Sequence, residues 1–381
     1  MDSFKGSISS LKANQSVSDG IKSVYPHAEV RAFPMADGGE GTVETLVDGM
    51  DGIHVNLEVT GPLGAPVSAS YGYLGSEKLA IIEVAAACGL PLLAKSELDP
   101  FATTTYGVGE LICHAYNEGA RKYIIGLGGS ATNDGGVGML QALGFEFLDE
   151  DGAEIGYGGG SLQDIVQIRL TPEADKFSDC EFRVACDVSN VLYGENGATY
   201  VFGPQKGAKE ESLPELDAGM KHYAEMTFEQ LGFDISNIEG GGAAGGLGAA
   251  FHGYLGGMLQ SGVDLVMEVL GVKKVMKNAN LVITGEGRLD AQTSMGKVPA
   301  GLAAVAAEYR IPVIAVGGSL TDDAYELNNA GIDAVFSIQS SPMSIEEAMQ
   351  DELTRFNLEK TVGQIMRVLK LNAKVEIPSP S

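Results

Sequence analysis

Apolar strands, glycine-rich loops and helices follow one another in the same order along much of this chain. Residues 122–127, KYIIGL, lead through such a loop into a helical pattern at about 136–143. Residues 281–284, LVIT, likewise precede a loop and a predicted helix at 299–309. The apolar run at 312–316 predicts a further strand. Continuous apolar strands that alternate with helices are typical of a parallel sheet covered on both faces. The order therefore predicts an α/β fold. The stretch at residues 240–259, which is mostly Gly and Ala, predicts a further, buried helix.

The stretch between residues 53 and 84 departs from this order. It contains short alternating runs separated by Gly-Pro and Gly-Ser turns, which favour antiparallel hairpins. We therefore predict two dissimilar α/β domains. One is Rossmann-like, with a parallel sheet built from both chain ends, residues 1–52 and 278–381. The other is an inserted domain with a mixed sheet, residues 53–277.

The composition fits a chain with many tight turns and a strongly acidic surface. Glycine accounts for 52 of the 381 residues, roughly twice the usual share of about 7%, and no Gly-X-Y period occurs. The chain has 25 basic and 51 acidic residues, which give a net charge of −26. Such a charge repels nucleic acid and anionic membrane surfaces, so we expect neither of them as a partner.

The amino terminus and the cysteines indicate in which cellular compartment the protein is expected. The first residues, MDSFKG, are polar and no apolar targeting segment follows, so we expect a cytoplasmic protein. The four cysteines include no Cys-x-x-Cys pair, which favours reduced thiols over a disulfide framework or a zinc site. A parallel α/β domain normally opens with an apolar strand, whereas Asp2 directly follows Met1, so we expect such a strand to be missing from this sequence.

The most prominent loop, GLGGSATNDGG at residues 126–136, lies between an apolar strand and a helix. Glycines allow backbone amides to converge on an anion, and a helix amino terminus adds the positive end of its dipole. We predict a phosphate or carboxylate cradle here. Its candidate residues are Gly128, Gly129, Ser130, Asn133 and Asp134. The alternative is a tight turn in which Asn133 or Asp134 caps the helix.

The pattern at residues 28–33 predicts another strand, and a second loop, ADGGEGT at residues 36–42, joins it to a helix. Its carboxylates, Asp37 and Glu40, suit Mg²⁺ or the hydroxyls of a polyol. The alternative is an N-cap at Asp37 with Glu40 as its capping-box partner. Lys5 is expected near this loop, where a lysine neutralises phosphate charge or is simply solvated.

A third loop, at residues 284–297, presents Glu286, Asp290 and Lys297. This combination suits phosphoryl transfer, which needs a metal ligand, a base and charge neutralisation. The loop is not a Walker A motif because position 291 is Ala and position 298 is Val. Two more candidates follow the same logic: Lys206 stands between glycines, and Asp187 ends a predicted strand.

Several other chemistries lack their motifs. The sequence contains neither His-Glu-x-x-His nor Gly-x-Ser-x-Gly, and its five histidines are dispersed. The 126–136 loop matches a relaxed dinucleotide fingerprint, Gly-x-Gly-x-x-Ala, but no well-placed acid follows about 20 residues later. These observations weaken metalloprotease, serine hydrolase and nicotinamide-dependent readings.

Taken together, the loops resemble those of bacterial glycerate kinases of the first type, in family order across nearly the whole chain. The matching blocks are DSFKGS at 2–7, PMADGGEGT at 34–42, TTTYGVGEL at 103–111, GGSATNDGG at 128–136, QKGA at 205–208, GAAGGLG at 242–248, and GEG with Asp290, Gln292 and Gly-Lys at 285–297. One departure is Asn190-Val191-Leu192, where the family tends to have Asn-Pro-Leu. The resemblance implies two dissimilar α/β domains with an active-site cleft between them. It also implies transfer of the ATP γ-phosphate to D-glycerate, with 2-phosphoglycerate favoured over 3-phosphoglycerate as the product.

The resemblance also suggests roles for the candidate residues. Asp187 or Asp290 is expected to be the base. Lys5, Lys206 and Lys297 are expected to bind phosphate or carboxylate groups, and Lys5 is placed with the catalytic residues. Asp37, Glu40 and Glu286 are the candidates for binding Mg²⁺ or a substrate hydroxyl.

The expected partners are ATP with Mg²⁺ and D-glycerate, with a homodimer as the candidate assembly. Two other functions stay open at this point. An NAD(P)-dependent hydroxy-acid dehydrogenase would use the 126–136 loop for a pyrophosphate, and a non-catalytic sugar-acid binding protein would bind glycerate without turning over ATP.

Overall fold

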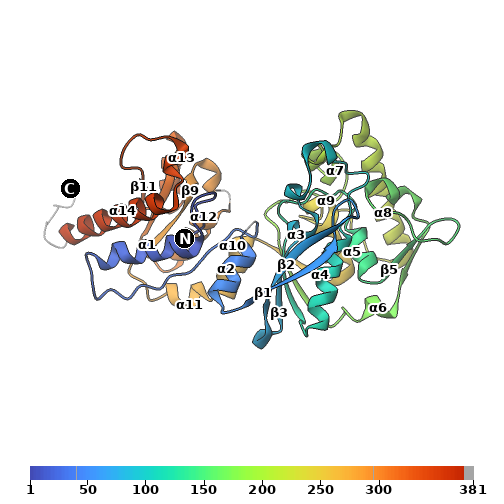
Figure 1. Cartoon of the computed structure of the whole chain (residues 1–381), viewed down its shortest axis with the longest axis horizontal. Coiled ribbons are helices and arrows are strands. Elements are labelled where there is room, and N and C mark those ends of the chain that lie inside the picture. Colours follow the sequence, from blue (N-terminus) through green and yellow to red (C-terminus); the bar gives the residue numbers. More distant parts are fainter. Residues whose placement is uncertain (40, 295, 373–381) are drawn as a thin grey trace. The chain divides into compact units, whose positions relative to one another are not determined.

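The computed structural model of this chain has the predicted α/β fold and describes residues 1–39, 41–294 and 296–372 (Figure 1). The chain forms two compact units. Unit 1 comprises Met1–Asp37 together with Val266–Ser381, and unit 2 comprises Gly38–Leu265. The domain boundaries expected from the sequence, 1–52 with 278–381 and 53–277, stay a prediction. Each unit is described by itself below.

Unit 2 is built on a six-stranded mixed sheet with the order β1-β2-β3-β4-β7-β8. Its strands are β1 Ile53–Thr60, β2 Pro66–Leu74, β3 Leu79–Glu83, β4 Lys122–Gly126, β7 Glu181–Ala185 and β8 Met258–Gln260. β1, β2 and β3 pair antiparallel, which confirms the predicted hairpins. β3, β4, β7 and β8 run parallel. The register pairs Gly126 with both Glu83 and Ala185, so the carboxyl ends of three strands meet at one edge.

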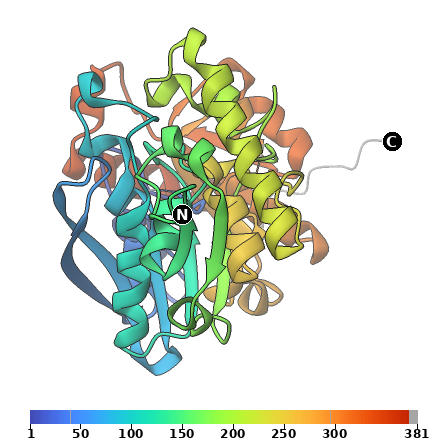
Figure 2. The ribbon, with the colours of Figure 1, turned by 90° about the vertical axis from the view of Figure 1, so that its right-hand side faces the viewer.

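Helices and a small second sheet cover the six-stranded sheet of unit 2. The helices are α2 Thr42–Gly49, α3 Ala85–Cys88, α4 Tyr106–Asn117, α5 Val137–Ala142, α6 Pro172–Asp175, α7 Ala198–Phe202, α8 Leu213–Leu231 and α9 Ala243–Leu255, and α10 Gly262–Val269 begins here. β5 Phe145–Leu148 pairs with β6 Gln167–Leu170. Helix α4 lies along β1, β2 and β3 (Figure 2).

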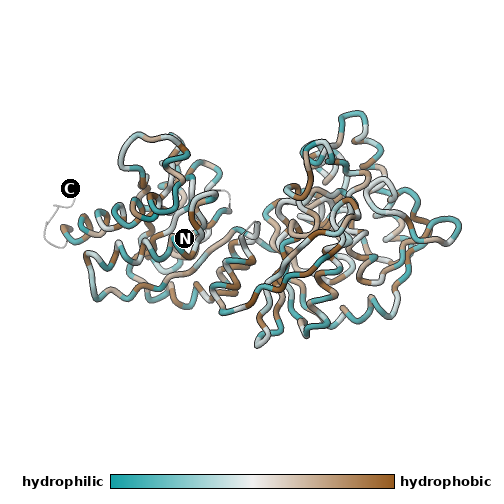
Figure 3. Tube along the Cα trace, viewed as in Figure 1, coloured by the Kyte–Doolittle hydropathy of each residue, from teal (hydrophilic) through white to brown (hydrophobic). Residues whose placement is uncertain are grey.

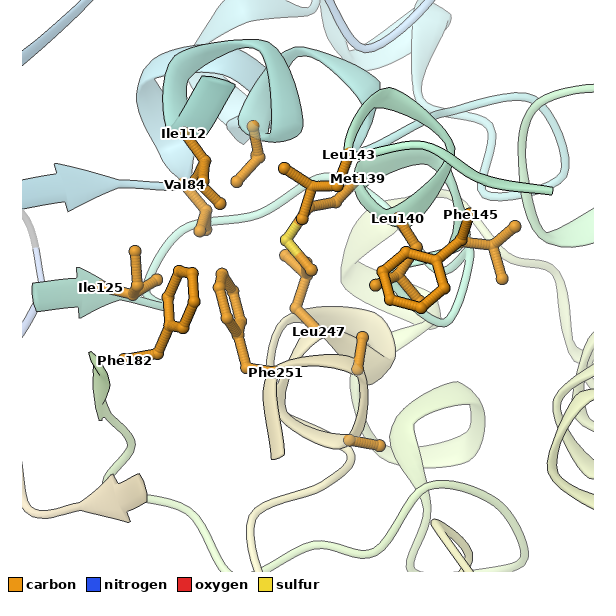
Figure 4. Close-up of a cluster of buried hydrophobic side chains, with 14 of the residues drawn as sticks. Val84, Ile112, Ile125, Met139, Leu140, Leu143, Phe145, Phe182, Leu247 and Phe251 are labelled. Atoms are coloured by element: carbon orange, nitrogen blue, oxygen red, sulfur yellow. The ribbon is translucent and has the colours of Figure 1, made fainter. Parts of the chain in front are cut away.

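The core of unit 2 lies between the sheet and these helices. Phe182 of β7 faces Phe251 of α9, and the centres of their rings are 5.9 Å apart (Figure 4). Met139 of α5 and Ile125 of β4 lie in the same buried cluster. The apolar residues follow the strands and inner helix faces, whereas polar residues follow the outer turns (Figure 3). Burial of this apolar surface is the main stabilising contribution to the unit.

Unit 1 contains a parallel three-stranded sheet with the order β11-β10-β9. Its strands are β9 Val282–Leu289, β10 Val313–Leu320 and β11 Ala334–Ser337. Its helices are α1 Ser10–Lys22, α11 Val272–Met276, α12 Val298–Glu308, α13 Ile345–Ala348 and α14 Asp351–Asn372, and the segment Asp322–Ala330 is a 3₁₀ helix. Ser9 caps α1 by accepting a hydrogen bond from the Lys12 amide.

The two chain ends pack together in unit 1. Helix α1 contacts α14, and the approach is close because a Cβ at Gly20 would lie 2.6 Å from the Glu359 carbonyl oxygen. The Oγ atoms of Ser7 and Thr354 are 2.6 Å apart and share a hydrogen bond. Val17, Leu358 and Val362 are buried in the same apolar cluster. The first and last helices of the described chain therefore form one layer.

Two expected elements differ from the structure. Residues 28–33 form no strand, because an extended segment counts as a strand only when a neighbour pairs with it; the Phe33 carbonyl instead accepts from the Met1 amino group and from Asn14. The helix expected over 240–259 is interrupted at its start. Ala244, Gly245 and Gly246 all have left-handed backbone angles, so the regular part of α9 begins after them.

Candidate functional site

The glycine loop of unit 2, residues 127–136, joins β4 to α5. Gly128 and Gly129 are exposed, whereas the following residues to the start of α5 are buried. A short antiparallel bridge fixes the loop: the Leu90 amide donates to the Gly129 carbonyl, and the Ala131 amide donates to the Cys88 carbonyl. The two exposed glycines are therefore the part of the loop that a ligand can reach.

Asp134 lies inside this loop and is 1% exposed. Its carboxylate accepts hydrogen bonds from the amide and hydroxyl of Thr105, both at 2.8 Å, and from the amides of Gly136 at 3.1 Å and Gly138 at 3.3 Å. Burial raises the pKa of Asp134, while these hydrogen bonds oppose the shift. The carboxylate thus ties the start of α4 to the start of α5, which agrees with the capping alternative drawn from the sequence.

Lys206 lies much later in the sequence and contacts the same loop. It is 2% exposed, and its Nζ donates to the Ser130 hydroxyl at 3.0 Å and to the Thr132 carbonyl at 2.7 Å. Burial lowers the pKa of Lys206 to about 8, and the charges of Cys88 and Asp134 counteract this shift. The ammonium group is therefore enclosed by the loop.

Asn133 provides a third attachment of the loop. Its amide nitrogen donates to the Thr199 hydroxyl of α7 at 3.0 Å, and the residue is fully buried. Within the described part of the chain its Oδ1 atom has no hydrogen-bond partner. A buried acceptor without a partner is uncommon in folded proteins.

Asp187 follows β7 at the sheet edge where β3 and β4 also end. It is exposed, and its Oδ1 accepts a hydrogen bond from the Gly262 amide at 3.1 Å. The segment at Gly38 and Gly39 packs on this edge: a Cβ at Gly38 would lie 2.5 Å from that of Ala185, and one at Gly128 would lie 3.2 Å from the Gly39 Cα. Unit 2 thus gathers a carboxylate and the exposed glycines at neighbouring strand ends, where ligands of α/β sheets bind.

The second group of candidates lies in unit 1, around the end of β9. Glu286 is largely buried, and its carboxylate accepts from the Thr293 hydroxyl at 2.6 Å and lies 3.8 Å from the Lys297 Nζ. Burial raises the pKa of Glu286 to about 7, helped by the charges of Asp2 and Asp290 and opposed by Thr293 and Lys297. Arg288 lies 3.5 Å from the Asp290 carboxylate, whose Oδ1 has no hydrogen-bond partner among the described residues.

Asp2 belongs to this group although the sequence analysis did not single it out. Its amide donates to the Gly285 carbonyl at 2.9 Å, which places it beside β9. Burial raises the pKa of Asp2 to about 6, and the neighbouring Asp37 charge adds to the shift. Asp2 lies in the block DSFKGS, from which only Lys5 was selected as a candidate. Membership of that block is the sequence feature that could have identified Asp2.

The remaining candidates are placed as follows. The Lys5 backbone passes Gly287, whose Cβ would lie 3.3 Å from the Lys5 amide nitrogen. Asp37 is close enough to Asp2 to affect its pKa, and Glu40 lies outside the described residues. The structure therefore brings Lys5, Asp37, Glu286, Asp290 and Lys297 into unit 1, and the glycine loop, Asp187 and Lys206 into unit 2.

The carboxylates of unit 1 suit a hard cation by their chemistry. Within residues 1–39, 41–294 and 296–372, no three His, Cys, Asp or Glu side chains come together as a metal site. Mg²⁺ commonly takes only one or two protein carboxylates and completes its shell with water and substrate phosphates. Glu286 and the unpartnered Oδ1 of Asp290 fit that mode of binding.

Comparisons with known proteins agree on one family. The glycerate kinase family model matches residues 1–370. The glycerate 2-kinase of Escherichia coli K12 is 48% identical over 92% of both chains, and the glycerate kinase of Bacillus subtilis 168 is 46% identical over 97% of this chain and 96% of its own. A crystal structure described as "putative glycerate kinase 2" from Salmonella typhimurium LT2 superposes with a TM-score of 0.91 at 43% identity and covers 98% of both chains. No helix in the described part of the chain has the length and apolar character to span a membrane.

Proposed function

Because this chain belongs to the glycerate kinase family, we propose that it transfers the γ-phosphate of ATP to the 2-hydroxyl of D-glycerate and releases 2-phosphoglycerate. Family membership makes it a kinase that phosphorylates an alcohol group of glycerate, with ATP as co-substrate. The choice of the 2-hydroxyl is supported by the relative from Escherichia coli, which is described as a glycerate 2-kinase. A homodimeric assembly and a cytoplasmic location stay predictions from the sequence.

One observation carries the proposal. Asp187 and the exposed glycines Gly128 and Gly129 stand at the ends of two paired parallel strands, β7 and β4. A carboxylate at this position can accept the proton of an attacking hydroxyl, and backbone amides beside it can bind an anionic group of either substrate. The arrangement thus supplies a base and an anion cradle within one unit.

In the proposed reaction the glycerate hydroxyl oxygen forms a bond to the γ-phosphorus, and the bond between that phosphorus and the β,γ-bridging oxygen breaks. The hydroxyl proton passes to a carboxylate, for which Asp187 is our first choice and Asp290 the second. Lys5 and Lys297 would neutralise phosphate charge. Asp37, Glu286 and Asp290 would supply oxygen ligands to Mg²⁺, which neutralises phosphate charge when bound.

The direct test is a coupled assay of ADP release with D-glycerate as acceptor, followed by separation of 2-phosphoglycerate from 3-phosphoglycerate. We expect ADP release that depends on glycerate, with 2-phosphoglycerate as the product. A folded protein that binds glycerate without releasing ADP would instead be a binding protein. Formation of 3-phosphoglycerate alone would refute the choice of hydroxyl.

The choice of base is tested by Asp187→Asn and Asp290→Asn. Loss of a general base lowers kcat by about 10²- to 10⁴-fold, and we expect this loss for Asp187→Asn. Asparagine can still accept from the Gly262 amide, so the local fold should survive. Asp217→Asn is the matched control, because Asp217 also accepts from a backbone amide, that of Gly194 at 2.9 Å. If Asp187→Asn keeps near-normal kcat, Asp187 is not the base; if Asp290→Asn keeps it as well, neither residue is.

A further inference from the structure

We propose that Asp134 and Lys206 are positioning residues that hold the glycine loop in shape from two sides and do not contact either substrate. This inference rests on the proposed role of the loop as an anion cradle, and it revises the substrate-binding role that the sequence analysis gave both residues. It depends on how their polar atoms are already used.

The carboxylate of Asp134 is used almost fully by the protein itself. A carboxylate offers about four acceptor positions, two on each oxygen. The Asp134 Oδ2 accepts hydrogen bonds from the Thr105 amide, the Thr105 hydroxyl and the Gly138 amide, and its Oδ1 accepts from the Gly136 amide. Because the residue is 1% exposed, a substrate hydroxyl could reach the remaining position on Oδ1 only by opening the buried loop. Opening the loop would leave buried backbone amides without partners, which is unfavourable.

The ammonium group of Lys206 is also used by the loop. Two of its three hydrogens are directed at Ser130 and Thr132 of the loop, and the Asp134 charge opposes the lowering of its pKa by burial. Lys206 is also 2% exposed. A substrate phosphate would have to pass the buried residues 130–133 to reach it.

The backbone behind Lys206 is fixed as well. Gly207 follows it with a left-handed φ of +100°, and a Cβ there would lie 2.3 Å from the Leu98 carbonyl oxygen. This close contact holds the short 3₁₀ helix Pro204–Lys206 in place. Together with the bond from Asn133 to Thr199, the loop is attached at three sides, and only Gly128 and Gly129 are left at the surface.

Such attachments have a catalytic consequence. Donors that are fixed before the substrate arrives stabilise developing charge without reorganising during the reaction. A displacement of reacting groups by about 1 Å costs about 10²-fold in rate. The pair would therefore act on the chemical step through the loop, and its loss should appear mainly in kcat.

The test uses the full-length protein with Lys206→Met, Asp134→Asn and the double variant. Lys122→Met is the control, since Lys122 is exposed at the opposite end of β4. We expect Lys206→Met to lower kcat by about ten- to hundredfold, with the KM values for ATP and D-glycerate each within about threefold of the wild-type values. A tenfold or larger rise in one KM at unchanged kcat would make Lys206 a ligand of that substrate and overturn the inference.

Urea unfolding of the same four proteins and the wild type gives a second readout. The Asp134 charge acts on Lys206 across the loop that both residues hold, so we expect the double variant to be more stable than the sum of the single effects predicts. Additive effects would show that the two residues do not act as a pair. This readout needs no activity: a wild-type protein without ADP release refutes the proposed function, while the unfolding data still decide the inference.

Amide hydrogen exchange of the wild-type protein covers the case in which the variants do not fold. If the loop is held in advance, the amides of residues 130–138 exchange slowly without any ligand. Fast exchange that becomes slow only when D-glycerate and ATP are added would mean that the substrates order the loop, and would overturn the inference.

Discussion

Asp2, Glu286 and Lys206 of this kinase are buried ionisable groups whose pKa values lie outside their ordinary ranges because of their surroundings. The pKa of Asp2 is about 6, that of Glu286 is about 7, and that of Lys206 is about 8. Burial is the largest cause in all three cases, since it disfavours the charged form. All three pKa values lie close to neutral pH. The charge of the candidate site residues in unit 1 and in unit 2 therefore depends on pH in the range where enzymes are assayed.

The substitution Glu286→Gln tests whether burial of the Glu286 carboxylate makes stability depend on pH. The folded-state pKa of Glu286 is raised from 4.5 to about 7, so wild-type stability falls as pH rises from about 4.5 to 7 and the loss is complete above 7. Glutamine removes the charge and can still accept from Thr293. We expect the variant to gain on the order of 2 kcal/mol over the wild type at pH 8 and almost nothing at pH 4.5, measured by urea unfolding.

Glu326→Gln provides the control for this prediction, because Glu326 is exposed on the same unit. Its effect on the free energy of unfolding should be small. A Glu286→Gln variant that is less stable than the wild type at pH 8 would mean that the pair with Lys297 outweighs the cost of burial.

Residue type and loop position were enough to select candidate site residues, but they did not predict the burial or the hydrogen-bond partners of those residues. Asp134 and Lys206 were expected to face a ligand, and the structure encloses both of them. Their partners, Thr105 and Thr132, are 29 and 74 residues away along the chain. Spacing in a sequence carries no information on such contacts. Asp2 was missed for the same reason, since its pKa depends on burial and on Asp37.

At the scale of elements, the glycine loop and the start of α9 are pressed against each other. The Gly135 amide donates to the Gly245 carbonyl at 2.9 Å. A Cβ at Gly246 would lie 2.6 Å from the Gly135 Cα, and one at Gly136 would lie 2.5 Å from the Ala250 Cβ. The glycines of both segments therefore permit a contact between two backbones, in addition to any role in binding an anion.

Gly245→Ala should be far more damaging than Gly256→Ala at the other end of the same helix. Both glycines have left-handed φ angles, +72° and +62°. A Cβ at position 245 would lie 2.0 Å from the Thr132 carbonyl oxygen, whereas one at position 256 would meet nothing within 4 Å. We expect a loss of about 1–2 kcal/mol for Gly256→Ala from backbone strain alone, and about 1–3 kcal/mol more for Gly245→Ala from the clash.

Thermal or urea unfolding of the two variants provides this comparison, and kcat provides a second one. Because the clash falls on the loop, Gly245→Ala should also lower kcat, whereas Gly256→Ala should not. Equal stability losses in the two variants would mean that the loop and α9 can move apart at little cost.

The hydropathy pattern predicted the helices and strands well where a segment follows a single periodicity, either that of a strand or that of a helix. The hairpins of β1 to β3 and the strand, loop and helix order around β4 and β9 were predicted from such patterns. The start of α9 was not, because hydropathy does not reveal that Ala244 adopts a φ of +53°. The expected strand at 28–33 failed because a strand depends on a paired neighbour, which a local pattern cannot supply.

At the scale of the whole molecule, the net charge of −26 opposes the approach of anionic substrates. The Debye length falls from about 30 Å at 0.01 M salt to about 8 Å at 0.15 M, so salt weakens this repulsion. We expect kcat/KM for D-glycerate to rise by roughly two- to fivefold over that range, measured at constant free Mg²⁺ with two different neutral salts. A fall in kcat/KM would show that the lysines near the site dominate the field that glycerate meets.

The pairing of α1 with α14 also sets an order of events during protein synthesis. Residues 38–265 form a unit that is continuous in sequence, so it can fold soon after its last strand leaves the ribosome. Helix α1 must wait for a partner that begins at Asp351. At about 5–20 residues per second, that wait lasts for tens of seconds. During this time Ala13 and Val17 of the nascent chain lack the cover that they have in the finished protein. Helix α1 is therefore synthesised before the whole of unit 2 but becomes stable after it.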